Sequence, residues 1–263
     1  MKKYKIHIPT SQYGFLECKG DRLDELLDLH NSIADKPLAR NNGAYIKIKT
    51  FTKETILYND ATHIYTDEDG NKLVSGSNFA KDFGKVFPKD MILPKVAKKA
   101  GVSDDVIDSM WSDSGEAAAG FGTAIHKMLE NYAKYRGVSA YKLPNHKVMQ
   151  DILTSCPIYE EKRELLPEVM LSNIERKMCG MIDILAKNKD GSYDVLDYKI
   201  VYNIQKDIDK YTAQLSYYAH ILKFAGHKVN KLYLIVYDGK WEKIEVKIMT
   251  LKEMANPKKE ITI

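Results

Sequence analysis

The sequence predicts a mixed fold of strands and helices, of the α/β or α+β class, because the two kinds of segment alternate along the chain. Residues 176–187 and 193–202 are rich in Ile, Val, Leu and Tyr, and they flank a turn with Asp190-Gly191 at its centre. Residues 206–224 then repeat apolar side chains at helical spacing. Residues 231–237 and 242–249 predict a second hairpin. We therefore expect a hairpin, a helix and another hairpin in that order.

The size and composition suit a packed core. A chain of 263 residues is near the upper limit for one hydrophobic core, so we expect one main domain with an appendage. Its 44% hydrophobic and 10% aromatic residues exclude a disordered or collagen-like chain. No apolar run approaches the roughly 20 residues that a membrane span needs, and residues 1–9 do not read as a signal peptide. We expect a cytoplasmic protein with no membrane partner.

The sequence predicts a small N-terminal accessory region of strands and helices over residues 1–110, followed by a main domain over 111–263. Strands are predicted at 4–8, 45–51, 55–58, 63–66 and 72–75, a helix at 21–33, and mostly helix over 77–111. In the main domain, a long helix is predicted over 114–136, with a stretch of small residues and Gly137 as its stop. A shorter helix is predicted at 146–153.

The charge balance is compatible with nucleic acid without proving it. Forty basic residues against 36 acidic ones leave a formal charge of +4, and only five of the basic residues are arginines. Lysine tracks phosphates as a point charge, whereas arginine reads bases. Six lysines lie between residues 81 and 100, and Lys95, Lys98 and Lys99 form their densest group. They predict either a solvated helix face or a phosphate-tracking patch.

The first hairpin carries a cluster of charges. If it folds about Asp190, paired residue numbers sum to about 380, which places Asp183 roughly opposite Asp197. Side chains alternate along a strand, so Lys199 shares a face with Asp197. Two facing carboxylates are unfavourable, and a divalent cation such as Mg²⁺ or Mn²⁺ would resolve the conflict. The alternative is that Lys199 simply bridges the two aspartates.

Three further features lie outside this hairpin. His126 and Glu130 are four residues apart on one helix face, and Gln214 and Tyr218 are four apart on another, where Lys210 extends the face one turn back. Glu168 adds a carboxylate upstream of the hairpin. Taken singly, each of these has an ordinary structural explanation.

In this order the residues resemble a known family. Gly122-x-x-x-His126, Glu168, Gly180-Met-Ile-Asp183, Asp197-Tyr-Lys199 and Gln214-x-x-x-Tyr218 resemble the PD-(D/E)xK nuclease superfamily and, within it, the RecB-like exonucleases. The resemblance covers about residues 114–237, and residues 1–110 have only the general look of the N-termini of phage or mobile-element nucleases.

The resemblance implies a restriction-endonuclease-like core, with a central mixed sheet flanked by helices and a metal site where strands diverge. It implies one or two Mg²⁺ or Mn²⁺ ions held by Asp183, Asp197, His126 and the backbone carbonyl of Tyr198. Lys199 would orient or deprotonate the attacking water, and Glu168 would be a supporting carboxylate. The helix with Gln214 and Tyr218 would position the lysine or the nucleic-acid backbone. Outside the resemblance, the lysine cluster alone predicts that Lys95, Lys98 and Lys99, together with Lys210, contact nucleic acid, and the alternative for residues 1–110 is docking of a partner protein.

The cysteines select a branch of that family. Some relatives carry a four-cysteine iron–sulfur cluster, which Cys18, Cys156 and Cys179 cannot build, so the cluster-free, phage-type branch fits better. We expect a metal-dependent DNA nuclease, an exonuclease of recombination, repair or phage DNA processing, with a recombination or single-strand-binding protein as a further partner. The alternatives are a structure-specific or restriction-like endonuclease and an inactive DNA-binding module. Polarity, strand preference and oligomeric state stay open.

Overall fold

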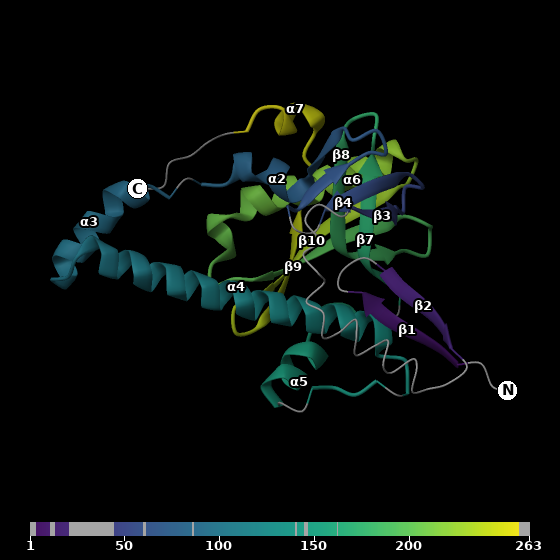
Figure 1. Cartoon of the computed structure of the whole chain (residues 1–263), viewed down its shortest axis with the longest axis horizontal. Coiled ribbons are helices and arrows are strands. Elements are labelled where there is room, and N and C mark those ends of the chain that lie inside the picture. The colour runs from purple at the N-terminus through teal and green to yellow at the C-terminus, as the bar shows by residue number, and fades with distance from the viewer. Residues whose placement is uncertain are drawn as a thin grey trace. The chain divides into compact units, whose positions relative to one another are not determined.

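A computed structural model of the chain shows a mixed α+β fold (Figure 1). The structure describes residues 4–10, 14–20, 45–59, 62–85, 87–139, 141–144, 147–161 and 163–257. The helix predicted at 21–33 lies outside these residues. The chain divides into two compact units, which are Met1–Val74 with Ser172–Cys179 (unit 1) and Ser75–Leu171 with Gly180–Ile263 (unit 2). In the described part of the chain no helix is long and apolar enough to cross a membrane.

Unit 1 is built largely from antiparallel strands, which include the five predicted ones and one that was not predicted, at residues 14–20. Asp67 stabilises the predicted hairpin turn at residues 67–71, because its carboxylate accepts hydrogen bonds from the backbone N–H groups of Asp69 (3.0 Å) and Asn71 (2.8 Å). The pairs are β1 (Tyr4–Thr10) with β2 (Gly14–Gly20), and then, in chain order, β3 (Tyr45–Lys49), β4 (Thr55–Asn59), β5 (Ile64–Thr66) and β6 (Lys72–Ser75).

The sheet of unit 2 is mixed. Its strand order is β11-β10-β9-β8, with β7 paired to β8. β8–β9 and β10–β11 are antiparallel hairpins, whereas β9 and β10 are parallel, because the α6 helix crosses over between them. The strands are β7 (Glu164–Asn173), β8 (Met178–Lys187), β9 (Tyr193–Ile200), β10 (Val229–Tyr237) and β11 (Trp241–Val246), and the helix is α6 (Ile208–Phe224).

The register of the β8–β9 hairpin is the predicted one. Ile184 pairs with Leu196 and Lys187 with Tyr193, so the paired numbers sum to 380 in both cases. The turn is closed by Asp190, whose Oδ1 accepts hydrogen bonds from the backbone N–H (3.1 Å) and the hydroxyl (2.6 Å) of Ser192. Side-chain chemistry at the turn therefore fixes which residues of the two strands face each other.

The helices of unit 2 differ from the prediction at their boundaries. The segment predicted as mostly helical over 77–111 is divided, because Gly101 (φ 69°) caps one helix in the left-handed conformation and Ser103 precedes the next. The long helix therefore begins at Asp104 instead of Ser114. The helices are α2 (Gly76–Ala80), α3 (Lys89–Ala100), α4 (Asp104–Tyr135), α5 (Lys147–Thr154) and α7 (Leu251–Met254), with 3₁₀ turns at Lys81–Phe83, Pro157–Tyr159 and Ile204–Lys206.

The predicted domain boundary at residue 110 falls inside α4, and residues 75–110 group with unit 2. The physical reason lies in α2, which packs on α6. The ring of Phe79 stacks on that of Tyr217, with centroids 4.8 Å apart, and Ala80 is fully buried. A short helix with these contacts belongs to the core of unit 2.

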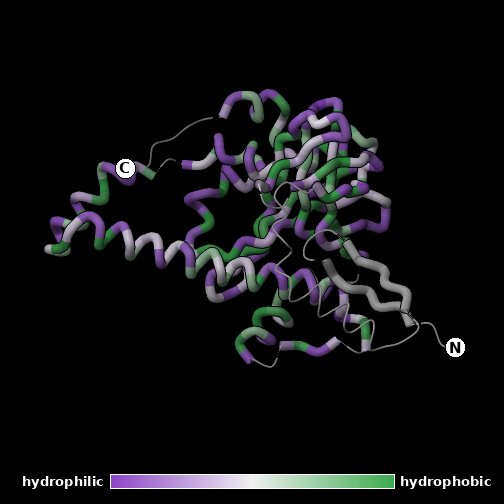
Figure 2. Tube along the Cα trace, in the orientation of Figure 1, coloured by the Kyte–Doolittle hydropathy of each residue, from purple (hydrophilic) through white to green (hydrophobic). Residues whose placement is uncertain are grey.

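Helices cover both faces of the sheet, and β9 shows this by the alternation of its side chains. Tyr198 points toward α4 and α5, in a buried cluster with Ile125, Leu129 and Leu153. The next residue, Lys199, lies over the ring of Tyr211 on α6. Along α4, hydrophilic and hydrophobic residues follow one another (Figure 2), and most side chains between residues 111 and 124 are exposed.

Both cysteines whose side chains are described, Cys156 and Cys179, are buried and free. Burial raises the pKa of each thiol to about 12, so both are inert packing residues.

Candidate active site

The β8–β9 hairpin brings Asp183 to the backbone of β9. Asp183 is the residue next to Ile184, whose pairing with Leu196 is the last pair of the β8–β9 ladder. Its Oδ2 accepts a hydrogen bond from the backbone N–H of Tyr198 at 2.8 Å. The carboxylate is thereby fixed between the two strands, close to the residues that follow Leu196.

His126 reaches the same carboxylate from α4. Its Nδ1 lies 3.4 Å from Asp183 Oδ2, and its ring meets the ring of Tyr198 edge-on, at 5.8 Å and 86°. Tyr198 is itself fixed, because its hydroxyl hydrogen-bonds to that of Tyr159 at 2.7 Å, and Tyr159 donates to the carbonyl of Leu129 on α4. The structure thus brings His126 and Asp183 together, as the order of the motifs suggested.

Asp197 and Lys199 form a buried ion pair on the face of β9 opposite to the side chain of Tyr198. Asp197 is only 3% exposed, and burial raises the pKa of its carboxyl to about 6, assisted by the nearby Asp183 and opposed by Lys199. Burial alone would lower the pKa of Lys199, but Asp197 outweighs it, so the pKa of Lys199 is raised and the ammonium stays charged. Among the described residues, no group hydrogen-bonds with good geometry to Asp197 Oδ2, although Lys199 is in ion-pair contact with it.

A second aspartate on the same strand shows the contrast. Asp194 is also buried, but Arg163 (2.5 Å), Asn188 (3.1 Å) and Asn230 (2.9 Å) all donate to its carboxylate. Burial alone would raise the pKa of the Asp194 carboxyl, but these donors outweigh burial, so the pKa is lowered. Asp194 is a carboxylate that several donors satisfy, whereas Asp197, three residues on, has Lys199 as its ion-pair partner.

Tyr211 of α6 links two lysines at this end of the sheet. The ammonium of Lys199 lies 4.7 Å from the centre of its ring and that of Lys210 lies 5.4 Å from it. Lys210 is thus near the catalytic lysine predicted from the sequence.

Gln214 and Tyr218 serve a packing role in this structure. Gln214 Nε2 donates to the hydroxyl of Tyr218 at 3.1 Å. The ring of Tyr218 lies so close to Gly180 and Gly76 that a Cβ at either glycine would overlap it. The glycine of Gly180-Met-Ile-Asp183 is therefore needed for close approach of α6 to β8. Sequence reasoning missed Gly76, whose only signal is its place at the start of a helix.

Glu168 joins a separate cluster. Its Oε2 lies 3.7 Å from Lys134 Nζ, and Lys134 also contacts Glu130 on α4. Lys127 and Lys134 were missed as site residues, although their spacing from Glu130 places all three on one helix face. In the described part of the chain, no ion pair or hydrogen bond joins Glu168 to Asp183.

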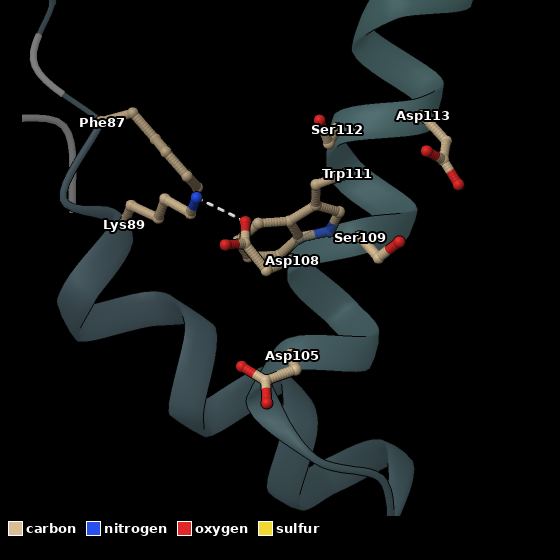
Figure 3. Close-up of a pocket in the computed structure, with 8 residues that line it drawn as sticks. All are labelled: Phe87, Lys89, Asp105, Asp108, Ser109, Trp111, Ser112 and Asp113. Atoms are coloured by element: carbon tan, nitrogen blue, oxygen red, sulfur yellow. Dashed lines mark ion pairs between the residues drawn. The ribbon is translucent and has the colours of Figure 1, made fainter.

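The predicted lysine patch is exposed. Lys95, Lys98 and Lys99 lie on the surface of α3. The last two occupy its final turn, where the helix dipole favours positive charges. A pocket between α3 and α4 contains none of the predicted site residues (Figure 3). Phe87 meets Trp111 edge-on there, at 5.7 Å, and Lys89 pairs with Asp108.

The residues fit a hard divalent cation in their chemistry. Carboxylates and one imidazole are suitable ligands for Mg²⁺ or Mn²⁺, and among the described residues the buried Asp197 carboxylate forms an ion pair with Lys199. Over the residues that the structure describes, no three His, Cys, Asp or Glu side chains already lie close enough to form a metal site.

Comparisons with known proteins leave the family open. No family model and no curated protein matches the chain. One of the solved structures that match, titled "Crystal structure of SSO0001", has 13% identity and a TM-score of 0.30 over 49% of this chain. The match spans 66% of that chain, just under two thirds of its length. A score this low does not establish a shared fold, so the function is inferred from the residues themselves.

Proposed function

We propose that this protein is a metal-dependent DNA nuclease of the PD-(D/E)xK superfamily, with a restriction-endonuclease-like core, and that it acts as an exonuclease. The observation that carries this proposal is the meeting of Asp183 with His126 beside the buried Asp197–Lys199 pair. A buried carboxyl group with a raised pKa and a specific charged partner, such as Asp197 with Lys199, is a candidate for a functional site. The lysine-rich, arginine-poor composition suits an enzyme that handles the DNA backbone rather than reading bases.

The ligands of one or two divalent cations would be Asp183, Asp197, His126 and the carbonyl of Tyr198. Such a cation supplies charge neutralisation at the phosphate and lowers the pKa of bound water. Within the chain, Asp197 keeps Lys199 charged, which favours a role in orienting water over a role as base. The Tyr198 N–H and His126 hold the Asp183 carboxylate in place. Tyr211 covers the ammonium of Lys199.

The proposal predicts the result of single substitutions. Asp183→Asn, Asp197→Asn and Lys199→Ala should each reduce Mg²⁺-dependent cleavage of linear DNA by at least about 100-fold, because each removes a group from the reacting centre. Asp151→Asn, which alters an exposed carboxylate on α5, is the matched control and should cleave normally. Circular dichroism checks that each variant is folded. Full activity in folded Asp183→Asn would exclude this site.

A second candidate is a DNA-binding module without catalysis. The ion pair between Lys199 and Asp197 favours it, since a lysine that neutralises a carboxylate can be purely structural. Titration calorimetry with Mn²⁺ separates the two functions. Heat of binding in wild-type protein that disappears in Asp183→Asn supports the nuclease, and no heat at millimolar Mn²⁺ supports the binding module.

A further inference from the structure

Two carboxyl groups outside the candidate active site, Glu130 on α4 and Glu168 on β7, share Lys134 as a partner. Glu130 is 5% exposed, and the side chain of Glu168 is 19% exposed. The backbone of Glu168 has a φ of 49°, a left-handed conformation that is uncommon for a residue other than glycine. Such a conformation persists only where surrounding contacts hold it.

The two carboxyl groups have unequal surroundings. Lys127 Nζ donates to Glu130 Oε2 at 2.7 Å, and Lys134 contacts Glu130 Oε1, so each oxygen of Glu130 has its own cation. Among the described residues, Glu168 pairs only with Lys134, whose Nζ lies 3.7 Å from Oε2, too far for a hydrogen bond. The negative charge is therefore better placed on Glu130, and a proton is better placed on Glu168.

We propose that Glu130 and Glu168 form a carboxyl–carboxylate pair that shares one proton, in which uncharged Glu168 donates a hydrogen bond to Glu130 and positions α4 against β7. Glu168 is then a positioning residue and not a metal ligand. Glu130 lies one helical turn beyond His126, so the pair fixes the part of α4 that brings His126 to Asp183. This role rests on the proposed nuclease function, whereas the shared proton does not.

The titration behaviour agrees with the geometry. Burial raises the pKa of Glu168 to about 8, with Glu130 adding to the effect through hydrogen bonding and charge, and Lys134 and Lys127 opposing it. For Glu130, burial alone would likewise raise the pKa. The interactions with Glu168, Lys127 and Lys134 outweigh burial, so the pKa of Glu130 is lowered. Neighbouring acids whose environments move their pKa values apart are assigned as one acid and one base.

The test compares Glu168→Gln with Glu168→Ala, because glutamine keeps a neutral donor and alanine does not. The matched control is Glu164→Gln, which makes the same change at an exposed residue of the same strand, paired with Lys187 at 3.5 Å. Glu168→Gln should keep Mg²⁺-dependent cleavage and the half-saturating Mg²⁺ concentration within about threefold of wild type. Glu168→Ala should lower the cleavage rate, and Asp183→Asn should abolish it.

The second measurement is independent of catalysis. The urea midpoint of wild-type protein should fall as the pH rises from about 6 to about 8, because over this window the folded pair still holds a proton that the unfolded chain has already lost. In Glu168→Gln most of this fall should be lost, and in Glu164→Gln it should remain. An infrared band of a protonated carboxyl near neutral pH should likewise be present in wild type and absent in Glu168→Gln.

The outcomes are distinguishable. If Glu168→Gln loses cleavage as completely as Asp183→Asn, Glu168 is a catalytic carboxylate and the positioning role is wrong. If the urea midpoint of Glu168→Gln keeps the wild-type dependence on pH, the shared proton is wrong. If wild-type protein cleaves no DNA but shows the pH dependence that Glu168→Gln removes, the pair stands and the nuclease function fails.

Discussion

At the scale of single residues, the candidate site concentrates a buried charge that the protein does not fully compensate. Asp197 is buried with Lys199 as its partner, yet the pKa of its carboxyl is raised to about 6. Asp194 on the same strand has a lowered pKa because three side chains donate to it. A carboxyl group whose ionisation stays unfavourable after pairing with a lysine is the kind of group that a bound cation stabilises in its charged form.

This cost predicts how stability depends on pH and metal. The folded-state pKa of Asp197 is higher than its ordinary value of 3.8, so its contribution is fully present below about pH 3.8 and is lost as the pH rises through about 6. Chelated wild-type protein should therefore lose stability over this window, and Asp197→Asn should lose less. Millimolar Mg²⁺ should restore the melting temperature of wild type above pH 6 and leave Asp197→Asn unchanged. Equal responses of the two proteins would contradict this role of Asp197.

At the scale of elements, the approach of α6 to α2 and β8 depends on two glycines. Gly180 and Gly76 leave room for the ring of Tyr218, and a Cβ at either position would overlap it. Because Tyr218 is 3% exposed, the ring has little space into which it can move. The Gly180-Met-Ile-Asp183 motif therefore combines a packing requirement with a chemical one.

Gly180→Ala should lower the free energy of unfolding by about 1–3 kcal/mol through overpacking against Tyr218. The matched control is Gly120→Ala on α4, where nothing lies within 4 Å of the added Cβ. In that exposed helix interior, alanine should stabilise by about 0.5–1 kcal/mol. Urea unfolding measures both changes. An unchanged free energy of unfolding in Gly180→Ala would show that the ring of Tyr218 can move aside.

Some elements could be predicted from sequence and others could not. The register of the β8–β9 hairpin follows from Asp190-Gly191, because turn chemistry is local. The sequence places the start of α4 at Ser114 instead of Asp104, because most of residues 111–124 are exposed and give no amphipathic pattern. The partners of Glu168 could not be predicted, since Glu130 lies far from it in the sequence and their contact depends on tertiary packing.

At the scale of the whole molecule, the small net charge of +4 hides an uneven distribution. The negative charges of Asp183, Asp197 and Glu130 lie in clusters with lysine or histidine partners. The lysines of α3 at positions 95, 98 and 99 are exposed instead, so they are able to meet a polyanion.

Replacing Lys95, Lys98 and Lys99 together by Gln should weaken DNA binding and reduce the slope of log K against log salt by about 2–3, if all three contact phosphates. The control triple variant replaces three exposed lysines elsewhere, Lys206, Lys240 and Lys252. Fluorescence anisotropy over a range of salt concentrations gives both slopes. An unchanged slope in the α3 variant would leave these lysines as a solvated helix face.

The most direct test of the proposed active site is a time course on end-labelled linear DNA, single- and double-stranded, with Mg²⁺ and with EDTA. An exonuclease that uses Asp183 should release label or produce a ladder from one end only with Mg²⁺, and it should leave covalently closed circular DNA intact. Asp183→Asn should release nothing. Cutting of the closed circle would show that the enzyme is an endonuclease and not an exonuclease. No cleavage of any substrate by wild type, or equal cleavage by Asp183→Asn, would contradict the proposed active site.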